Sequence, residues 1–253
     1  MDEVLFSVDS GIAQITINRP ARSNALSPVV LKEMQRFLQM AGEDPGVRIV
    51  TLTGAGEKVF CAGLDLRASL KSGGQGSATN DFRRLLLEIV QCPKPTIALV
   101  RGHVVGGGIG IVLASDLCLA CSDVHFSTPE IQVGMFPMMV MGLLYRNIGR
   151  KKAAEMMFLG ERMTALQAQE SGIINHAYSR DQFETAAGEF VRKLAGKSAK
   201  ILKMGKKAIS RLLDEKLADE EEILESALVE VMATEDSREG IRAFIEKRQP
   251  RWN

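Results

Sequence analysis

The chain has little excess charge, few aromatic residues and no long apolar stretch. Its 253 residues carry 32 Lys and Arg against 31 Asp and Glu, a formal net charge of +1, and this balance excludes a wholesale basic surface for nucleic acid. Only 10 Phe, 2 Tyr and 1 Trp are present, too few to favour stacking platforms for bases. The apolar stretch Val104–Ala114 has 11 residues, whereas about 20 are needed to span a bilayer.

Cysteine and histidine are also scarce. The 4 cysteines form no framework of the kind that staples small secreted proteins. The acidic start MDEVLFSVDS also lacks the basic region of a signal peptide, so we expect reduced thiols in a cytoplasmic protein. The histidines His103, His125 and His176 are far apart and lack metal-site spacing, which favours structural roles and predicts no metal site.

The glycine cluster Gly106-Gly107-Gly108-Ile109-Gly110 does not complete a nucleotide motif. Ile111 stands where the G-x-G-x-x-G pattern needs its third glycine, and no complete P-loop pattern occurs. A G-x-S-x-G elbow is absent as well, which disfavours serine hydrolase chemistry. With 45% hydrophobic residues and 12 Met, the chain nevertheless predicts a full and adaptable aliphatic core.

Strand-like and helix-like segments alternate in the first part of the chain. Val4–Val8 and Ile12–Asn18 predict a hairpin around Asp9-Ser10-Gly11, and Ser27-Pro28 opens a helix to about Met40. The segments expected next are strand Arg48–Thr53, loop Lys71–Thr79, helix Asp81–Gln91, strand Thr96–Arg101, helix Gly107–Ala114 and strand Asp116–Ala120. This alternation predicts an α/β fold built from ββα or βα units.

Helical patterns dominate after Pro137. The expected helices are Met139–Ile148, Lys151–Phe158, Ala165–Glu170, Asp181–Leu194, Ala199–Leu213, Glu220–Ala233 and Ser237–Lys247. We therefore predict an α/β core at residues 1–195, followed by a helical C-terminal region at 196–253.

Two glycine-rich junctions offer backbone donors. Phe60–Leu66 follows a strand and a glycine-rich turn, and Gly106–Gly108 lies between a strand and an apolar helix. Glycine leaves the backbone N–H unblocked, and a helix N-terminus adds partial positive charge. Two such N–H groups facing one point would form an oxyanion hole. From spacing alone, tight turns where a helix packs on a strand are the simpler explanation.

Taken with other segments, these junctions resemble the crotonase (enoyl-CoA hydratase/isomerase) superfamily. The motifs occur in order along nearly the whole chain: Asn18-Arg19-Pro20, Asn24-Ala25-Leu26, Phe60–Leu66, Arg101-Gly102-His103, Gly106–Gly108, Thr128-Pro129-Glu130 with Gly134, and Glu239–Pro250. The resemblance implies a crotonase-like spiral of ββα units with a helical C-terminal trimerisation region, in a homotrimer or hexamer. It also implies an acyl-CoA thioester substrate and no cofactor beyond the coenzyme A that the substrate carries.

The resemblance assigns roles to particular residues. Leu64 and Gly107 match the two peptide N–H groups that hold the thioester oxygen as it gains enolate charge. Arg67 stands near the expected nucleotide phosphate, although a solvated surface charge explains it equally well. Phe244 and Lys247 match positions that reach coenzyme A, often on a neighbouring subunit, and an ordinary amphipathic helix is the alternative. The other residues assigned to substrate binding are Asn24, Ala25, Leu26, Ala62, Leu64, Asp65, Leu66 and Gly107.

One residue of the family pattern is missing. Hydratases of the family hold a water between two glutamates, of which the first falls on Gly110 and the second on Glu130. Without the resemblance, Glu130 would be a first-turn residue of a helix that Thr128 and Pro129 begin. A single base suits the removal of a C2 proton from a 3-enoyl thioester and its return at C4, which yields the 2-enoyl isomer.

An enoyl-CoA isomerase is therefore the favoured interpretation, and other readings stay open. One is a hydratase with Glu130 as its only acid/base, and another is an acyl-CoA decarboxylase, hydrolase or dehalogenase. A third is a catalytically weak acyl-CoA-binding protein, which the loss at Gly110 allows and the retained Glu130 argues against. Asp65 and Asp116 are interpreted as structural carboxylates. The residues expected to form an adaptable acyl pocket are Met135, Phe136, Met138 and Met139, with Met141 in the core.

Overall fold

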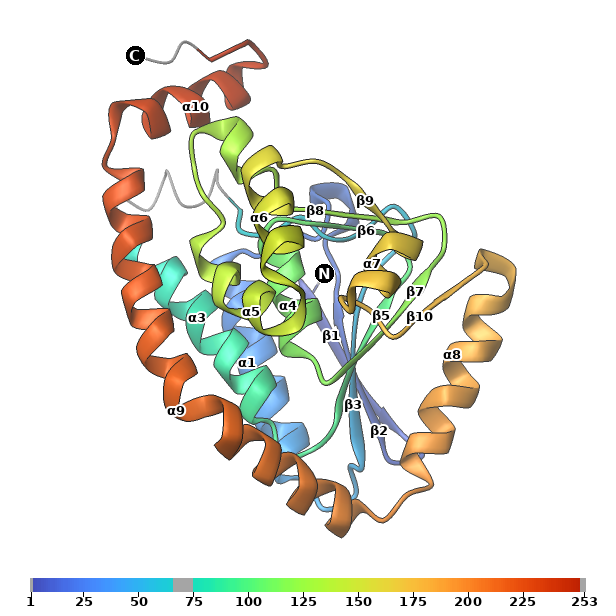
Figure 1. Cartoon of the computed structure of the whole chain (residues 1–253). Coiled ribbons are helices and arrows are strands. Elements are labelled where there is room, and N and C mark those ends of the chain that lie inside the picture. The colour runs from blue at the N-terminus through green and yellow to red at the C-terminus, as the bar shows by residue number, and fades with distance from the viewer. Residues whose placement is uncertain (1, 66–74, 251–253) are drawn as a thin grey trace.

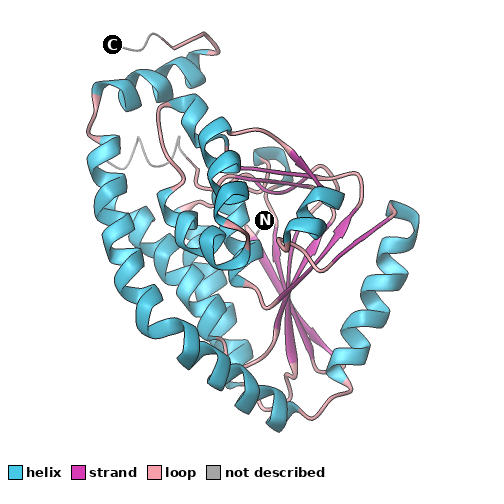
Figure 2. Cartoon of the chain, in the orientation of Figure 1, coloured by secondary structure: helices cyan, strands magenta, loops and turns pink. Residues whose placement is uncertain are grey.

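The computed structural model describes residues 2–65 and 75–250, with the backbone alone for 75–77, 210–224, 227 and 236. Figure 1 shows a central group of strands with helices on both sides. Figure 2 separates the strands from these flanking helices by colour. No described helix is both long and apolar enough to cross a membrane.

Six strands form the larger sheet, in the order β1-β2-β3-β5-β7-β10. β1 and β2 form the predicted antiparallel hairpin, and Ser10 and Gly11 turn it with φ of 50° and 77°. From β2 onward all pairings are parallel. The bounds are β1 Val4–Asp9, β2 Ile12–Ile17, β3 Ile49–Gly54, β5 Thr96–Val100, β7 Leu117–Cys121 and β10 His176–Tyr178.

A smaller sheet has the order β4-β6-β8-β9. Its strands are β4 Val59–Cys61, β6 His103–Val105, β8 His125–Ser127 and β9 Met163–Thr164. Three of them each follow a strand of the larger sheet in the chain: β4 follows β3, β6 follows β5 and β8 follows β7. A helical segment comes after each pair, which confirms the predicted α/β arrangement of ββα units.

The helices cover the larger sheet from two sides. α1 begins where the sequence predicts, because the Ser27 hydroxyl accepts a hydrogen bond from the Val30 N–H and Pro28 occupies the first helical position. In Figure 1, α1, α3 and α9 lie on one side of the strands and α8 lies on the other. The bounds are α1 Pro28–Glu43, α3 Gln75–Gln91, α4 Gly107–Ala114, α5 Met138–Asn147, α6 Arg150–Leu159, α7 Ala165–Ser171, α8 Arg180–Ala195, α9 Ala199–Met232 and α10 Glu235–Glu246, with 3₁₀ turns η1 Pro20–Arg22 and η2 Pro129–Val133.

Two predictions about the helices are wrong. Residues 75–79 were expected in a loop but form the first turns of α3, while 71–74 lie outside the described residues. Two separate helices at 199–213 and 220–233 were expected, but α9 runs continuously from Ala199 to Met232. The segment between them contains neither Gly nor Pro, so no residue ends the first helix. The predicted division after residue 195 falls at the end of α8, just before the turn to α9, and stays a prediction.

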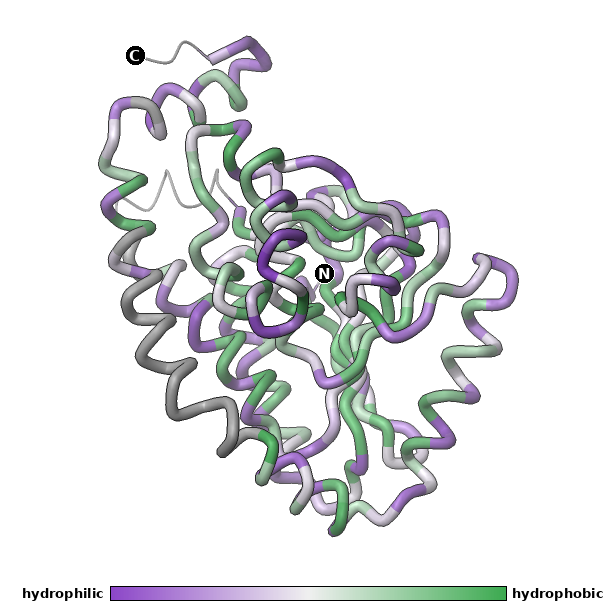
Figure 3. The backbone as a smooth tube through the Cα atoms, in the orientation of Figure 1, coloured by the Kyte–Doolittle hydropathy of each residue, from purple (hydrophilic) through white to green (hydrophobic). Residues whose placement is uncertain are grey.

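The core is one continuous, mainly aliphatic cluster in which Phe60, Phe82, Phe126 and Phe183 are also fully buried. Figure 3 shows hydrophobic residues along the central strands and hydrophilic residues on the outer turns. The four cysteines are free and buried within this core. Cys118 and Cys121 have the C-x-x-C spacing, but both lie in β7, where residues three apart point to opposite faces of the strand. The described residues contain no cluster of three His, Cys, Asp or Glu side chains placed to hold a metal ion.

Candidate active site

Three strand ends bring the expected site residues together. β4, β6 and β8 are adjacent and parallel, so their carboxyl ends meet at one edge of the smaller sheet. Leu64 comes three residues after β4, Gly107 two residues after β6, and Glu130 three residues after β8. The topology therefore places two backbone donors and one carboxylate around one point, although they are far apart in the sequence.

The backbones carrying the two donors are in direct contact. A Cβ atom built on Gly63, whose φ is +79°, would lie 2.7 Å from the Gly107 nitrogen, so this junction requires glycine. The Gly63 carbonyl accepts from the Leu26 N–H at 2.8 Å, and the Asp65 N–H donates to the Leu26 carbonyl at 3.1 Å. Because neighbouring backbone groups alternate in direction along an extended segment, the Leu64 N–H points away from Leu26.

Neither the Leu64 N–H nor the Gly107 N–H donates to a backbone acceptor within the described part of the chain. Gly107 is the first residue of α4, where a helix offers no internal partner for its N–H. Both groups border the cavity described below. Two unengaged backbone donors therefore lie on neighbouring segments at the edge of one cavity, which is the arrangement that an oxyanion hole requires.

The Glu130 carboxylate lies beside these donors in an apolar setting. A Cβ built on Gly106 would lie 3.0 Å from Glu130 Oε1, so the carboxylate packs against the glycine that begins α4. Its Oε2 is shielded from solvent and has no hydrogen-bond partner, even though the residue as a whole is only half-buried. Burial disfavours the charged form and raises the pKa of Glu130 to about 7. That value suits a group that must both take and return a proton near neutral pH.

Thr128 and Pro129 begin a short helix with Glu130 in its first turn, as local sequence predicts, but the Thr128 side chain does not cap it. Glu130 lies on the 3₁₀ turn η2, and the Thr128 hydroxyl donates to the Met156 carbonyl at 2.9 Å instead. This bond ties the beginning of the turn to α6.

A cavity of about 840 Å³ joins Leu64, Gly107 and Glu130 to an apolar pocket. The four pocket residues expected from the sequence all line it, whereas Met141 packs against the core as expected. Leu228 and Met232 of α9 and Phe82 of α3 complete the apolar wall. Sequence reasoning missed these three, because only the folded chain brings α3 and α9 to the cavity. An apolar pocket with a few converging polar groups is the usual form of a small-molecule site.

The position of the missing glutamate is filled by apolar side chains. A Cβ built on Gly110 would lie 2.9 Å from Val140 Cγ1 and 3.1 Å from Leu86 Cδ2. Gly110 does not line the cavity. A second carboxylate at this place would therefore have to displace Val140 and Leu86 before it could reach the cavity.

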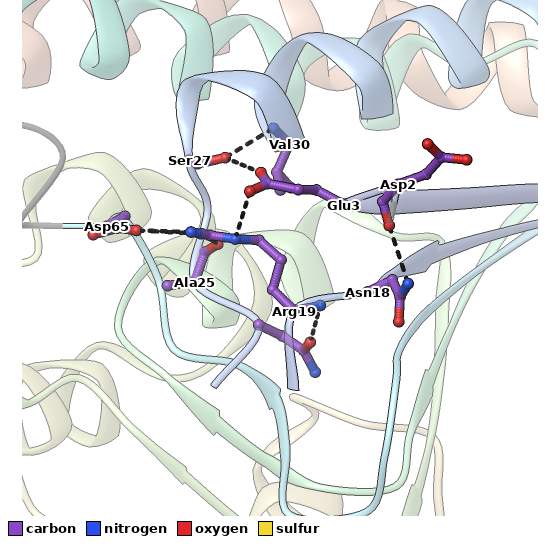
Figure 4. Close-up of polar contacts among 9 residues, drawn as sticks. Asp2, Glu3, Asn18, Arg19, Ala25, Ser27, Val30 and Asp65 are labelled. Carbon is purple, nitrogen blue, oxygen red and sulfur yellow. Dashed lines mark hydrogen bonds and ion pairs between the residues drawn. The ribbon is translucent and has the colours of Figure 1, made fainter. Parts of the chain in front are cut away.

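The loop segments expected beside coenzyme A are held by a polar network around Arg19. The Arg19 guanidinium donates to Asp65 Oδ2 at 3.2 Å and to the Ala25 carbonyl, and it pairs with Glu3. Figure 4 shows it between Asp65 and Glu3. Arg19 was predicted only as part of a motif, and the structure shows that it links both segments of the expected coenzyme A cleft.

Only some of the other residues predicted to bind the ligand line the cavity. The Asn24 side chain is fully buried and donates to the Ala55 and Val59 carbonyls, so it braces the loop, while Leu26 is also buried. Ala62 and Phe244 line the cavity, and Phe244 is 59% exposed. Lys247 ends α10 and does not line this cavity. Leu66 and Arg67 lie outside the described residues, and the coenzyme A roles of all these residues stay predictions.

The fold and the site define a class of protein: a ββα spiral in which two backbone donors and a buried carboxylate face an apolar pocket. The family model described as enoyl-CoA hydratase/isomerase matches residues 7–253. The chain belongs to this family and is an enzyme of the crotonase type, which confirms the predicted family and fold.

Relatives support this assignment over the full length. YngF of Bacillus subtilis, named as an enoyl-CoA hydratase/isomerase, is 34% identical over 98% of this chain and 97% of its own length. The solved structure of carnitinyl-CoA hydratase from Mycobacterium avium has a TM-score of 0.87 and 31% identity, covering 100% of this chain and 99% of the other. An enoyl-CoA hydratase/isomerase from Xanthobacter autotrophicus Py2 has a TM-score of 0.88 and 30% identity, with 99% and 98% covered.

Proposed function

We propose that the protein is an enoyl-CoA isomerase that moves a 3-enoyl-CoA double bond to the 2-position, with Glu130 as its single acid/base. One observation carries the proposal. Glu130 is a shielded carboxylate with a raised pKa, while Val140 and Leu86 fill the space where a second carboxylate would have to project from Gly110. A proton shuttle needs one such group, whereas hydration needs a water to be activated as well.

The proposed reaction balances with the residues of this site. Glu130 takes a proton from C2, the C2–H electrons form a C1=C2 bond, and the carbonyl electrons move onto the thioester oxygen. When the carbonyl forms again, the C1=C2 electrons become the C2=C3 bond, and the C3=C4 electrons bind the same proton at C4. In the dienolate between these steps, the negative charge lies largely on the thioester oxygen. The N–H groups of Leu64 and Gly107 would hold that oxygen, and losing one such donor typically raises a barrier by about 3–4 kcal/mol.

A hydratase is the second candidate, because several relatives are named enoyl-CoA hydratases and one solved neighbour is a carnitinyl-CoA hydratase. In that case Glu130 alone would activate the water and protonate C2. The cavity of about 840 Å³ has space for a water beside an acyl group. The filled position at Gly110 argues against efficient water activation.

Assembly and ligands belong to the same proposal. We infer a homotrimer or hexamer acting on acyl-CoA in the cytoplasm, with the segment around Leu64–Arg67 along the coenzyme A. The chemistry above needs no metal or redox cofactor, since backbone donors hold the charge and a carboxylate moves the proton. The four buried free thiols suit a reducing compartment.

Purified protein should be incubated separately with a 3-enoyl-CoA and the matching 2-enoyl-CoA, and the products followed by mass spectrometry. Isomerisation gives a product of equal mass with a shifted retention time, whereas hydration adds the mass of one water. Glu130→Gln should lower isomerisation by about a hundred- to ten-thousandfold. Glu161→Gln is the matched control, because Glu161 also borders the cavity but is exposed. Rapid hydration by the native enzyme, or full activity of Glu130→Gln, would refute the proposal.

A further inference from the structure

Two side-chain hydrogen bonds connect η2, the turn that carries Glu130, to α6 and the residue that follows it. The Thr128 hydroxyl donates to the Met156 carbonyl at 2.9 Å, and Gln132 Nε2 donates to the Gly160 carbonyl at 3.2 Å. Within the turn, the Met135 N–H donates to the Glu130 carbonyl at 3.0 Å. The Gly134 N–H also donates to the Ile131 carbonyl at 3.3 Å, so the end of η2 is closed by its own backbone bonds. The two bonds to α6 hold its beginning and middle, and at Val133 and Gly134 the turn packs against another element.

That element is α10, which meets the end of η2 through a glycine. A Cβ built on Gly240 would overlap the Val133 carbonyl group and lie 2.9 Å from the Gly134 nitrogen. Gly240 lies on the buried face of α10, together with Ser237, Ile241 and Ala243. The backbone of α10 therefore rests directly on the backbone of the turn, with no side chain between them.

The position of the Glu130 carboxylate depends on how η2 is placed. Oε2 has no hydrogen-bond partner, and the hydrogen bond that acts on the carboxylate comes from the backbone N–H of Glu130 itself. Where a carboxylate is not held by partners on other elements, its position follows from the turn that bears it and from the packing of that turn. Glu130 is three residues before Val133, so a shift at the end of η2 moves the carboxylate relative to the Leu64 and Gly107 N–H groups.

We propose that Gly240 is a positioning residue, and that the close contact it permits between α10 and η2 sets the place of the Glu130 carboxylate beside the oxyanion donors. The inference rests on the proposed role of Glu130 as acid/base. It gives the C-terminal helix a part in the reaction, although Gly240 has no side chain that could touch the substrate's reacting atoms.

Gly240→Ala tests this role, with Gly205→Ala as the matched control. Both replace a glycine inside a helix, but a Cβ on Gly205 meets nothing within 4 Å. Alanine favours helices over glycine, so Gly205→Ala should leave the turnover and its pH profile as in the native enzyme. Gly240→Ala should push the end of η2 away and lower kcat by about ten- to a hundredfold, because misplacement by about 1 Å has effects of that size. KM should change less than kcat, because Arg19 holds the loop segments expected along coenzyme A, even though Gly240 and Phe244 line the cavity.

The pH profile separates positioning from general weakening of the fold. Displacing the turn lets water reach the carboxylate, so the midpoint of the kcat profile should fall below its native value in Gly240→Ala. If Gly240→Ala keeps native kcat and midpoint per folded molecule, the inference is wrong. If it does not fold, Ala243→Gly removes a buried methyl from the same face of α10. It should then lower kcat about threefold or more with the same downward midpoint, and native values there would also overturn the inference.

Failure of the proposed function gives a different result. If native enzyme and Glu130→Gln turn over the 3-enoyl-CoA equally, the role of Glu130 is wrong. If Glu130→Gln is inactive while Gly240→Ala and Ala243→Gly behave as native enzyme, only the role of Gly240 is wrong.

Discussion

At the scale of single residues, the buried Glu130 links the chemistry to the stability of the fold. Its pKa is raised from 4.5 to about 7 by desolvation. Between these two values the folded protein binds more protons than the unfolded chain, so the free energy of unfolding falls as the pH rises through this window. The full penalty of holding the ionised carboxylate, at most on the order of 3 kcal/mol, is present above pH 7.

Glu130→Gln should therefore be more stable than native protein at pH 8 and about equally stable at pH 4.5. Glutamine has nearly the shape of the protonated acid, so only the cost of the charge is removed. Denaturant unfolding of both proteins at the two pH values measures the difference. A gain in stability that is the same at both values would show that shape, not ionisation, is the cause.

The catalytic pH profile should have the opposite sign. The base must be ionised to take the C2 proton, so isomerisation should increase with pH, with a midpoint near 7. Initial rates with saturating 3-enoyl-CoA should be measured between pH 5 and 9, roughly two pH units on either side of the expected midpoint. A midpoint near the ordinary carboxyl value of 4.5 would mean that Glu130 is hydrated in the working enzyme.

At the scale of elements, the packing of α4 against α3 and α5 decides how many carboxylates the site can hold. Gly110→Glu should not create a hydratase, because Val140 and Leu86 occupy the space of its side chain. Overpacking and a buried charge should destabilise the variant by about 3 kcal/mol or more. Thermal unfolding and the two-substrate assay measure both effects, with Gly149→Glu as the control, since a Cβ there meets nothing within 4 Å.

If Gly110→Glu instead folds normally and hydrates 2-enoyl-CoA, the side chains packed against residue 110 can move aside more easily than their contacts indicate. Combining Gly110→Glu with Val140→Ala and Leu86→Ala supplies the missing volume and is the route by which hydration should become possible.

The same elements show what can be predicted from the sequence. The hairpin, α1, α4 and the longer strands were predicted because each carries a period or a capping residue, such as Ser27 before α1. Strands β4, β6, β8 and β9 were not predicted, because two or three residues are too few to show alternation. Those short strands bring the site residues together. The resemblance therefore identified the residues, but only the structure shows that they lie close to one another. The packing of Leu86 and Val140 against Gly110 could not be predicted from the neighbouring sequence, because these two residues belong to other helices.

At the scale of the whole molecule, the C-terminal helices are bound to the α/β core at two distant places. One is the contact of Gly240 with η2, and the other is Lys206 of α9. The Lys206 ammonium is 6% exposed and donates to Asp116 Oδ2 at 2.6 Å and to the Lys94 carbonyl at 3.1 Å. Asp116 Oδ2 also accepts from the Thr96 N–H at 2.7 Å, so the network joins α9 to the first residue of β5 and to the residue before β7. Asp116 is thus a structural carboxylate, as the sequence predicted.

Lys206→Met should destabilise the protein by about 2–3 kcal/mol, at the lower end for a broken buried pair, because Asp116 is 32% exposed and can gain water. Asp116→Asn combined with Lys206→Met should recover part of that loss, since no unpaired carboxylate remains. Equilibrium unfolding of the native protein, the two single variants and the double variant gives the coupling energy. Because α9 also supplies Leu228 and Met232 to the pocket, hydrogen exchange along α9 should rise in Lys206→Met and return toward native in the double variant. Equal exchange in all four proteins would mean that apolar packing alone holds α9 in place.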